Sequence, residues 1–302
     1  MSKIKNAILG LAIGDALGVP VEFKSREILD RDPVMGMREY GTHDQPIGTW
    51  SDDTSLTLAT MDGIAKGEDA SGIMKRFCNW LYGGKYTAHD KVFDVGNTTG
   101  VAIRRFRDNP GIDPCSCGLT SSESNGNGSL MRILPIALAH VKSDDDMIIK
   151  MGMEGSSWTH GHMTSKLCCA YYCLVVAKLY NGFSIEESFE LATEAIRCRF
   201  NGLSDLEGIF DSREVPRAYI RSTGYVVHGL EVARWCMSNS SSYSEAVLKA
   251  INLGDDTDTN GAIVGGLAGL YFGNIPDEWL EQLQSRSRII KLINRFERSI
   301  YG

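Results

Sequence analysis

Two rows of glycine, one near each end of the chain, constrain the fold more than any other feature of the sequence. Each row repeats every four residues among apolar residues at helical spacing, with Gly10, Gly14 and Gly18 in the first and Gly261, Gly265 and Gly269 in the second. Glycine inside a helix costs about 1 kcal/mol relative to alanine, so a glycine face usually marks close approach by another backbone or by a ligand. We therefore predict two helices that pack closely against each other along these rows.

Helical spacing of apolar residues recurs along most of the remaining sequence. The segments that show it are residues 3–17, 54–65, 70–81, 99–106, 130–139, 144–155, 164–180, 184–198, 226–237, 242–254 and 287–298. Ser143 and Thr164 are candidate helix caps, and Ser184 and Ser242 each begin a capping box with a glutamate three residues later. No segment alternates polar and apolar residues over six or more positions. We expect an all-α fold of ten or more helices, in a single compact domain spanning residues 1–302.

Charge and composition narrow the class of protein. The net charge is -7 and the pI is about 5.4, which argues against general affinity for nucleic acid. No apolar run reaches the roughly 18 residues that span a bilayer, and the first residues lack the apolar core of a leader. Three of the eight cysteines lie in the apolar stretch 167–179, where buried free thiols are expected. We expect a cytoplasmic monomer with no membrane partner.

Two acidic clusters suggest a shared ion site. The first is Gly254-Asp255-Asp256-Thr257-Asp258-Thr259-Asn260-Gly261, and the second is Ser51-Asp52-Asp53-Thr54. Each runs into an apolar segment with helical spacing. A helix N-terminus stabilises a negative charge by only about 0.3–1 kcal/mol, so three crowded carboxylates imply a counter-charge. We interpret Asp255 as a solvent-facing or capping residue.

The spacing excludes one kind of ion site and favours another. Residues 256–261 resemble the start of an EF-hand loop, but the twelfth position is Leu267 instead of a bidentate glutamate. The remaining oxygen ligands are Ser51, Asp52, Asp53, Asp256, Asp258 and Thr259. Such ligands select Mg2+, Mn2+ or Ca2+ over zinc, and four carboxylates suit two ions about 3.5–4 Å apart. The alternative is a pair of helix caps with surface acids.

The motifs together resemble the ADP-ribosylglycohydrolase family, with the bacterial dinitrogenase reductase-activating type as the most similar branch. They are Gly14-Asp15-Ala16-Leu17-Gly18, Glu22-Phe23, Ser51-Asp52-Asp53-Thr54, Asn125-Gly126-Asn127-Gly128-Ser129-Leu130-Met131-Arg132 and Gly254-Asp255-Asp256-Thr257-Asp258-Thr259-Asn260. They occur in order across nearly the whole chain. The resemblance implies an all-α domain with two Mg2+ or Mn2+ ions, held by the six oxygen ligands named above, with Glu22 beside them. It also places Asp94 near the metals and the turn of residues 125–129 against the diphosphate and ribose.

The implied reaction is the removal of ADP-ribose from an ADP-ribosylated protein, with an arginine side chain as the favoured acceptor. Hydrolysis at the anomeric carbon needs an activated water, and either Glu22 or Asp94 is the candidate general acid or base. The turn at residues 126–129 precedes an expected helix start, where backbone N–H groups suit a diphosphate. His160 is interpreted as a capping or hydrogen-bonding residue instead of a metal ligand. Tyr225 is either a ring beside the adenine or ribose or a plain core residue.

Three alternatives stay open at the level of sequence. Within the hydrolase class, the acceptor is a serine, a small ester or a nucleobase, so nucleic acid would take part only as a modified substrate. A module that binds ADP-ribose or an ADP-ribosylating partner without turnover is a second possibility. A protein stabilised structurally by magnesium is the third.

Overall fold

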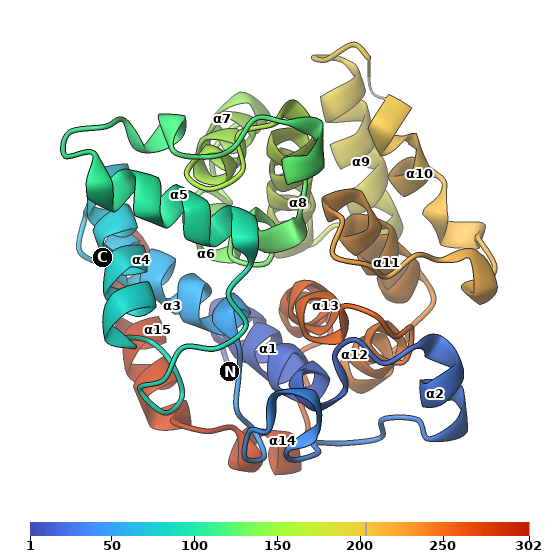
Figure 1. Ribbon diagram of the computed structural model, residues 1–302. Helices are drawn as coiled ribbons and strands as arrows, with labels where there is room; N and C mark the ends of the chain where they lie inside the picture. Colours follow the sequence, from blue (N-terminus) through green and yellow to red (C-terminus); the bar gives the residue numbers. More distant parts are fainter. Residues whose placement is uncertain (203, 302) are drawn as a thin grey trace.

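The computed structural model describes residues 1–202 and 204–301, and in these ranges the chain is almost entirely helical (Figure 1). The α-helices in chain order are α1 (Lys3–Gly18), α2 (Arg26–Arg31), α3 (Asp52–Ile64), α4 (Ala70–Gly83), α5 (Asn97–Asp108), α6 (Leu134–Ala139), α7 (Asp145–Ser157), α8 (Met163–Tyr180), α9 (Ile185–Arg197), α10 (Glu207–Phe210), α11 (Val226–Ser238), α12 (Tyr243–Ile251), α13 (Thr257–Tyr271), α14 (Asp277–Gln282) and α15 (Arg286–Tyr301). Extended pairing among the described residues is limited to isolated bridges. The all-α prediction is confirmed.

Helices α1 and α13 form the central pair and have extensive contact (Figure 1). A Cβ atom added at Gly14 would lie 1.9 Å from the carbonyl oxygen of Gly261, and one added at Gly10 would lie 2.3 Å from that of Gly265. A side chain would collide with the partner backbone at these distances, so the two helices can pack this closely only because these positions are glycine. A Cβ at Gly18 would lie 2.3 Å from the Cα of Asp258, which places the acidic start of α13 against the end of α1.

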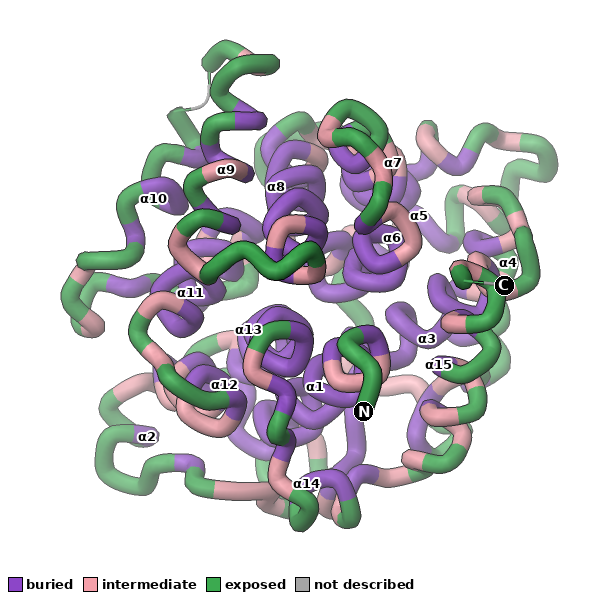
Figure 2. Tube along the Cα trace, turned by 180° about the vertical axis from the view of Figure 1, so that it is seen from behind, coloured by how far each residue is buried: buried purple, intermediate pink, exposed green. Residues whose placement is uncertain are grey.

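The other helices surround this pair. Helix α1 also contacts α3, α12 and α15, while α13 also contacts α8, α11 and α12. Figure 2 shows buried residues running along α1, α8 and α13, with exposed residues in peripheral segments such as α2. The start of α13 is therefore inside the protein, where a charge loses most of its contact with water.

Local signals placed most helix ends within a few residues. The capping box at Ser184 is present with both of its hydrogen bonds. Ser242 also caps its helix, but the Glu245 side chain accepts from Ser241 instead of completing the box. The predicted caps Ser143 and Thr164 are each displaced: Asp144 caps α7 and His162 caps α8.

Two predicted helix starts that border the acidic region need correction. Helix α3 begins at Asp52 instead of Thr54, so both aspartates of the first cluster lie in its first turn. The helix expected from residue 130 begins only at Leu134, after a 3-10 turn at Asn127–Ser129. Pro135 explains the late start, because a proline is tolerated in the first turn of a helix and not in its interior.

One expectation about membrane spans was too simple. The segment Lys3–Val21 has 19 residues and a mean hydropathy of 1.4, so by length and composition it could cross a bilayer. In the structure 89% of an 18-residue stretch of this segment is buried inside the protein. The segment therefore behaves as a core helix, in agreement with its contacts with α13. The expectation of free cysteines is confirmed, with Cys168, Cys169 and Cys173 buried in α8.

Candidate functional site

The acidic starts of α3 and α13 meet beside the end of α1. Asp15, on α1, is fully buried and accepts hydrogen bonds from the backbone N–H of Ser51 at 2.9 Å and of Thr54 at 3.0 Å. The hydroxyl of Thr54 donates to the same carboxylate. Asp15 therefore fixes the start of α3 on α1. No role was predicted for Asp15, although a single carboxylate within an apolar helix is a signal that could have indicated one.

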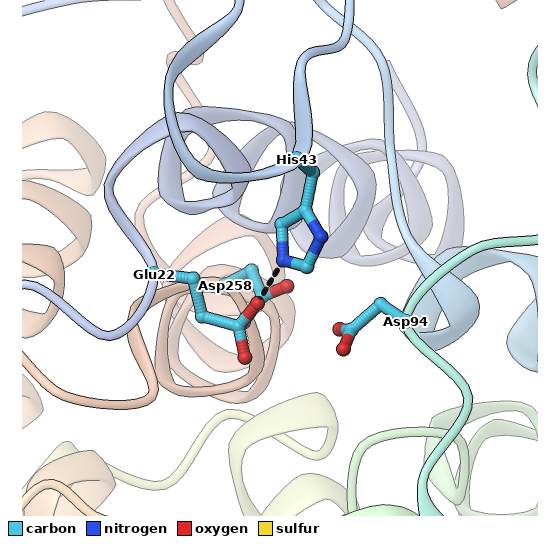
Figure 3. Close-up of side chains that lie close together, drawn as sticks. All are labelled: Glu22, His43, Asp94 and Asp258. Carbon is cyan, nitrogen blue, oxygen red and sulfur yellow. Dashed lines mark hydrogen bonds and ion pairs between the residues drawn. The ribbon is translucent and has the colours of Figure 1, made fainter.

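The carboxylates converge in two groups that share Asp258. Oxygen atoms of Asp15, Asp53 and Asp258 lie within 4.8 Å of one another. On the other side of Asp258, ligand atoms of Glu22, His43 and Asp94 meet it within the same distance (Figure 3). The structure thus brings together the predicted ligands Asp53 and Asp258 with both candidates for the general acid or base.

Glu22 is held in place by neighbours on two sides. Its carboxylate contacts Nε2 of His43, whose ring lies 5.3 Å from that of Phe93 between centroids. On the other side, the N–H of Phe23 donates to the carbonyl of Asp255 at 2.7 Å, which ties this segment to the start of α13. No sequence pattern pointed to His43, which lies in a stretch without helical spacing. Asp94 approaches from another loop, with its backbone in the left-handed region at φ 52°.

The carboxylates of the two groups, and that of Asp52 next to them, are destabilised as anions. Burial, followed by repulsion from nearby acids, raises the pKa values of Asp52, Asp53 and Asp258 well above the usual range. Burial also raises the pKa of Asp15 to about 6, against the hydrogen bonds that it accepts. The pKa of Glu22 rises to about 7, again mainly through burial, while the contact with His43 acts in the opposite direction.

The donor set fits bound divalent cations. Asp53 Oδ1, Asp256 Oδ1 and Asp258 Oδ2 are buried and accept no hydrogen bond from the described residues. Buried carboxylate oxygens without a partner are costly, and an added cation would supply the missing charge. Within the described part of the chain, the possible ligand atoms of the two groups are all oxygen except the imidazole of His43, and such a set favours hard ions such as Mg2+ or Mn2+.

The two predicted hydroxyl ligands link the acidic helix starts. Ser51 Oγ lies 2.8 Å from Asp53 Oδ2 and caps α3 by accepting from the N–H of Asp53. Thr259 Oγ1 lies 3.5 Å from the same oxygen of Asp53. Asp255 is exposed, in agreement with its interpretation as a solvent-facing residue. Asp256 accepts from the Asn127 amide at 2.8 Å, which attaches the glycine-rich turn to the acidic group.

A cavity of about 220 Å³ lies over the acids. Its lining consists of Glu22, Asp52, Asp94, Gly96, Asn97, Thr98, Thr99, Gly126, Asn127, Gly128, Met131, His160, Gly224, Asp256 and Thr259. A Cβ at Gly128 would lie 2.8 Å from Thr99 Oγ1 and 3.1 Å from Cε1 of His160, so a side chain there would collide with the opposite wall. Small residues in the turn keep this part of the cavity open.

The predicted substrate-binding residues divide into two sets. Gly126, Asn127, Gly128 and His160 line the cavity. Asn125, Ser129 and Tyr225 are outside its lining, because their side chains contact other parts of the protein. The amide oxygen of Asn125 accepts from Ser165, the hydroxyl of Ser129 contacts Ser156, and the ring of Tyr225 packs against His228.

The helix N-terminus at the cavity is not the one predicted. We expected the helix after residue 129 to present free N–H groups, but that segment is a short 3-10 turn. Instead, α5 begins at Asn97 with no side-chain cap, and its first residues line the cavity opposite the turn. An uncapped helix start favours an anion. This helix was predicted to begin two residues later, at Thr99, and no site was predicted at its start.

Comparisons with known proteins agree on one family. The family model described as ADP-ribosylglycohydrolase matches residues 1–302. The chain is 32% identical over 296 residues to the ADP-ribosylarginine hydrolase Tri1 of Serratia proteamaculans, covering 97% of this chain and 78% of the relative. It is 29% identical to the ADP-ribosyl-[dinitrogen reductase] glycohydrolase of Rhodospirillum rubrum, covering 93% of this chain and 90% of that one.

A solved structure shows the same fold. It is described as an ADP-ribosylglycohydrolase-related protein complex and superimposes with a TM-score of 0.84 at 27% sequence identity. The match covers 99% of this chain and 98% of the other. The fold is therefore shared from end to end.

Proposed function

The chain belongs to the ADP-ribosylglycohydrolase family, and from this premise we propose that it hydrolyses the bond between ADP-ribose and an arginine side chain of a modified protein. The products would be ADP-ribose and the unmodified arginine. The observation that carries the proposal is the group of buried carboxylates, with unpartnered oxygen atoms, at the base of a cavity large enough for part of a nucleotide sugar.

We propose that this group holds two divalent cations, Mg2+ or Mn2+. Asp52, Asp53, Asp256 and Asp258 would be the anionic ligands, and Ser51 and Thr259 the neutral ones. When bound, the cations would fix the ribose hydroxyls and make a bound water more acidic.

The chain's own residues account for orientation and proton transfer. Cleavage at the anomeric carbon develops positive charge on the ribose, which the surrounding carboxylates stabilise. Either Glu22 or Asp94 would accept the proton of the attacking water, since both carboxylates adjoin Asp258 and line the cavity. The burial that raises the pKa of Glu22 toward 7 suits proton exchange at neutral pH, and a nearby cation would lower that pKa.

Arginine is the favoured acceptor because of the relatives. The Tri1 proteins of Serratia proteamaculans and Pseudomonas putida, each 32% identical to this chain, are both named ADP-ribosylarginine hydrolases. Proteins named ADP-ribosylhydrolase ARH3 from cattle and humans are only 23% and 22% identical. A monomeric state and a cytoplasmic location, which we expected from the sequence, are part of the same proposal.

The test is a release assay with a panel of substrates. The protein would be incubated with Mg2+ or Mn2+ and with arginine-, serine- or nucleobase-linked ADP-ribose, and free ADP-ribose would be measured. Release from the arginine conjugate above the others is the expected result. Release from a different conjugate would change the acceptor, and ADP-ribose binding without release from any conjugate would favour a binding module.

The same assay separates the two proton-transfer candidates. Glu22→Gln and Asp94→Asn each remove one titratable group while keeping similar shape. The residue that acts as the base should lower kcat by about 100-fold or more when replaced, in line with the usual contribution of general base catalysis. Equal and small losses in both variants would contradict a role for either residue in proton transfer.

A further inference from the structure

Arg132 is a buried cation that the proposed reaction does not use. It lies just after the glycine-rich turn, is fully buried, and packs its guanidinium over the rings of Phe77 and Trp158 at 5.0 and 5.7 Å. No carboxylate pairs with it among the described residues. An unpaired buried charge is expensive, so its surroundings indicate what it does.

The guanidinium reaches the cavity wall through one hydroxyl. Nη2 of Arg132 donates to Thr159 Oγ1 at 2.6 Å and to the carbonyl oxygen of Gly155 at 3.0 Å. Thr159 Oγ1 lies 2.9 Å from Nδ1 of His160. Both Thr159 and His160 are buried, with 0% and 2% of their surface exposed.

The direction of these hydrogen bonds follows from the chemistry of the groups. A guanidinium can only donate, so Thr159 Oγ1 accepts from Arg132 and must place its own hydrogen elsewhere. The acceptor within reach is Nδ1 of His160. In the opposite tautomer, Nδ1–H would point at the hydroxyl, and the buried hydroxyl hydrogen would have no acceptor among the residues that the structure describes. A doubly protonated ring would also put a second positive charge beside Arg132, and burial together with Arg132 lowers the pKa of His160 to about 3.

We propose that Arg132 and Thr159 are positioning residues that hold His160 as the neutral tautomer with its hydrogen on Nε2, aimed into the cavity as a donor to a phosphate or sugar oxygen. Nε2 is the ring atom on the glycine side: it lies 3.6 Å from a Cβ built at Gly126 and 3.5 Å from one built at Gly128. It has no hydrogen-bond partner among the described residues, although His160 lines the cavity.

The backbone of His160 is fixed independently of this chain of hydrogen bonds. Its N–H donates to the carbonyl of Ser156 at 2.8 Å, and its carbonyl accepts from the hydroxyl of Ser156 at 2.9 Å. The ring therefore needs Thr159 only to select the tautomer. The identity of the ligand that Nε2 would contact rests on the proposed function. The tautomer of His160 does not, because it can be measured without any ligand.

The experiment is long-range proton–nitrogen NMR of the full-length protein labelled with 15N at its histidines. His160→Asn identifies the His160 signals among those of the six histidines. His162 serves as an internal reference, because the N–H of Thr164 donates to its Nδ1 and so fixes the same tautomer. We expect wild-type His160 to carry its hydrogen on Nε2 at pH 7.5. A hydrogen on Nδ1, or on both nitrogens, would overturn the proposal.

Thr159→Val keeps the shape of the side chain and removes the hydroxyl, while Thr159→Ser keeps the hydroxyl. In Thr159→Val we expect mixed tautomers and about tenfold weaker binding of ADP-ribose in calorimetry, with Mn2+ affinity unchanged; Thr159→Ser should behave as wild type. An unchanged tautomer and affinity in Thr159→Val would overturn the role of Thr159. If the wild-type protein did not bind ADP-ribose, the proposed function and the contact between His160 and ADP-ribose would both be contradicted. The proposed tautomer of His160 would still be tested by the NMR measurement on the wild-type protein.

Discussion

The two ends of α3 bury acids in opposite ways. At its start, Asp52 and Asp53 are surrounded by other carboxylates, and their pKa values are raised mainly by burial. Near its other end, Asp62 is also buried, with 5% of its surface exposed. Yet Asp62 receives contacts from Arg76, Arg295, Lys66 and the hydroxyl of Tyr86. Burial would raise the pKa of Asp62, but these partners outweigh it and lower the pKa.

The contrast separates an acid whose charge the chain balances with its own cations from acids whose charge it leaves largely unbalanced. At Asp62 the chain's own arginine and lysine side chains balance the charge of the carboxylate. Around the acidic starts of α3 and α13, the described residues contribute one imidazole, that of His43 beside Glu22, although the free N–H groups of two helices also favour negative charge there. An arrangement that withholds counter-charges is expected where the protein must bind cations from solution.

The largest effect is expected from a substitution at the start of α13. Asp258→Asn removes the carboxylate that both groups share, and we expect the rate of ADP-ribose release to fall by about a thousandfold or more, because a metal ion supplies several kcal/mol to such a reaction. The same substitution should raise the melting temperature of the metal-free protein, since it relieves repulsion among buried acids. Turnover that stays near the wild-type rate would contradict the assignment of Asp258.

At the other end of the helix the opposite result is expected. Asp62→Asn removes the charged acceptor that Arg76, Arg295 and Lys66 share, while Arg76 keeps its ion pair with Glu68. The substitution should lower the free energy of unfolding by about 2 kcal/mol in urea titrations, with or without Mg2+. Lys66→Ala is the matched control, because Lys66 is half exposed and its ion pair should contribute less than about 0.5 kcal/mol. If Asp62→Asn stabilised the metal-free protein as Asp258→Asn is expected to do, the comparison would fail.

A smaller effect is expected in the dependence of stability on pH. The folded pKa values of Asp52, Asp53, Asp258 and Glu22 are raised, so these groups bind more protons in the folded state than in the unfolded state between pH 5 and 7. The lowered pKa values of His160 and His228 act in the opposite direction, but they involve fewer groups. The metal-free protein should therefore gain stability as the pH falls from 7 to 5, by about 1 kcal/mol per pH unit or more. Saturating Mg2+ should flatten or reverse this slope in thermal unfolding. A metal-free protein that loses stability over this interval would contradict the raised pKa values.

The sequence predicted the features that depend on local pattern or on motifs. Helical spacing and caps gave the helix order, and the glycine rows gave the contact between α1 and α13. The aspartates were found because charge at the start of an apolar helix is unusual. The local sequence pattern did not identify residues whose part in the site depends on contacts with other segments of the chain. Asp15 contacts the start of α3, and His43 joins the acidic group through its contact with Glu22.

The lining of the cavity was also beyond local pattern. The turn at residues 125–129 looked like a helix start, but Pro135 delays α6, and the helix that begins at the cavity is α5. Asn125 and Ser129 belong to the expected motif, yet their side chains face other helices, because the turn exposes its glycines to the cavity. Such orientation is set by packing and not by the order of residues.

The most direct test of the account is the number of Mn2+ ions that the protein binds, measured by titration with the electron paramagnetic resonance signal of free Mn2+. We predict two ions per chain in the wild-type protein, a reduced number or much weaker binding in Asp258→Asn, and wild-type binding in Asp62→Asn. Absence of binding to the wild-type protein, or equal binding by Asp258→Asn, would contradict the claim that the unbalanced acids at the start of α3 and α13 form a cation site.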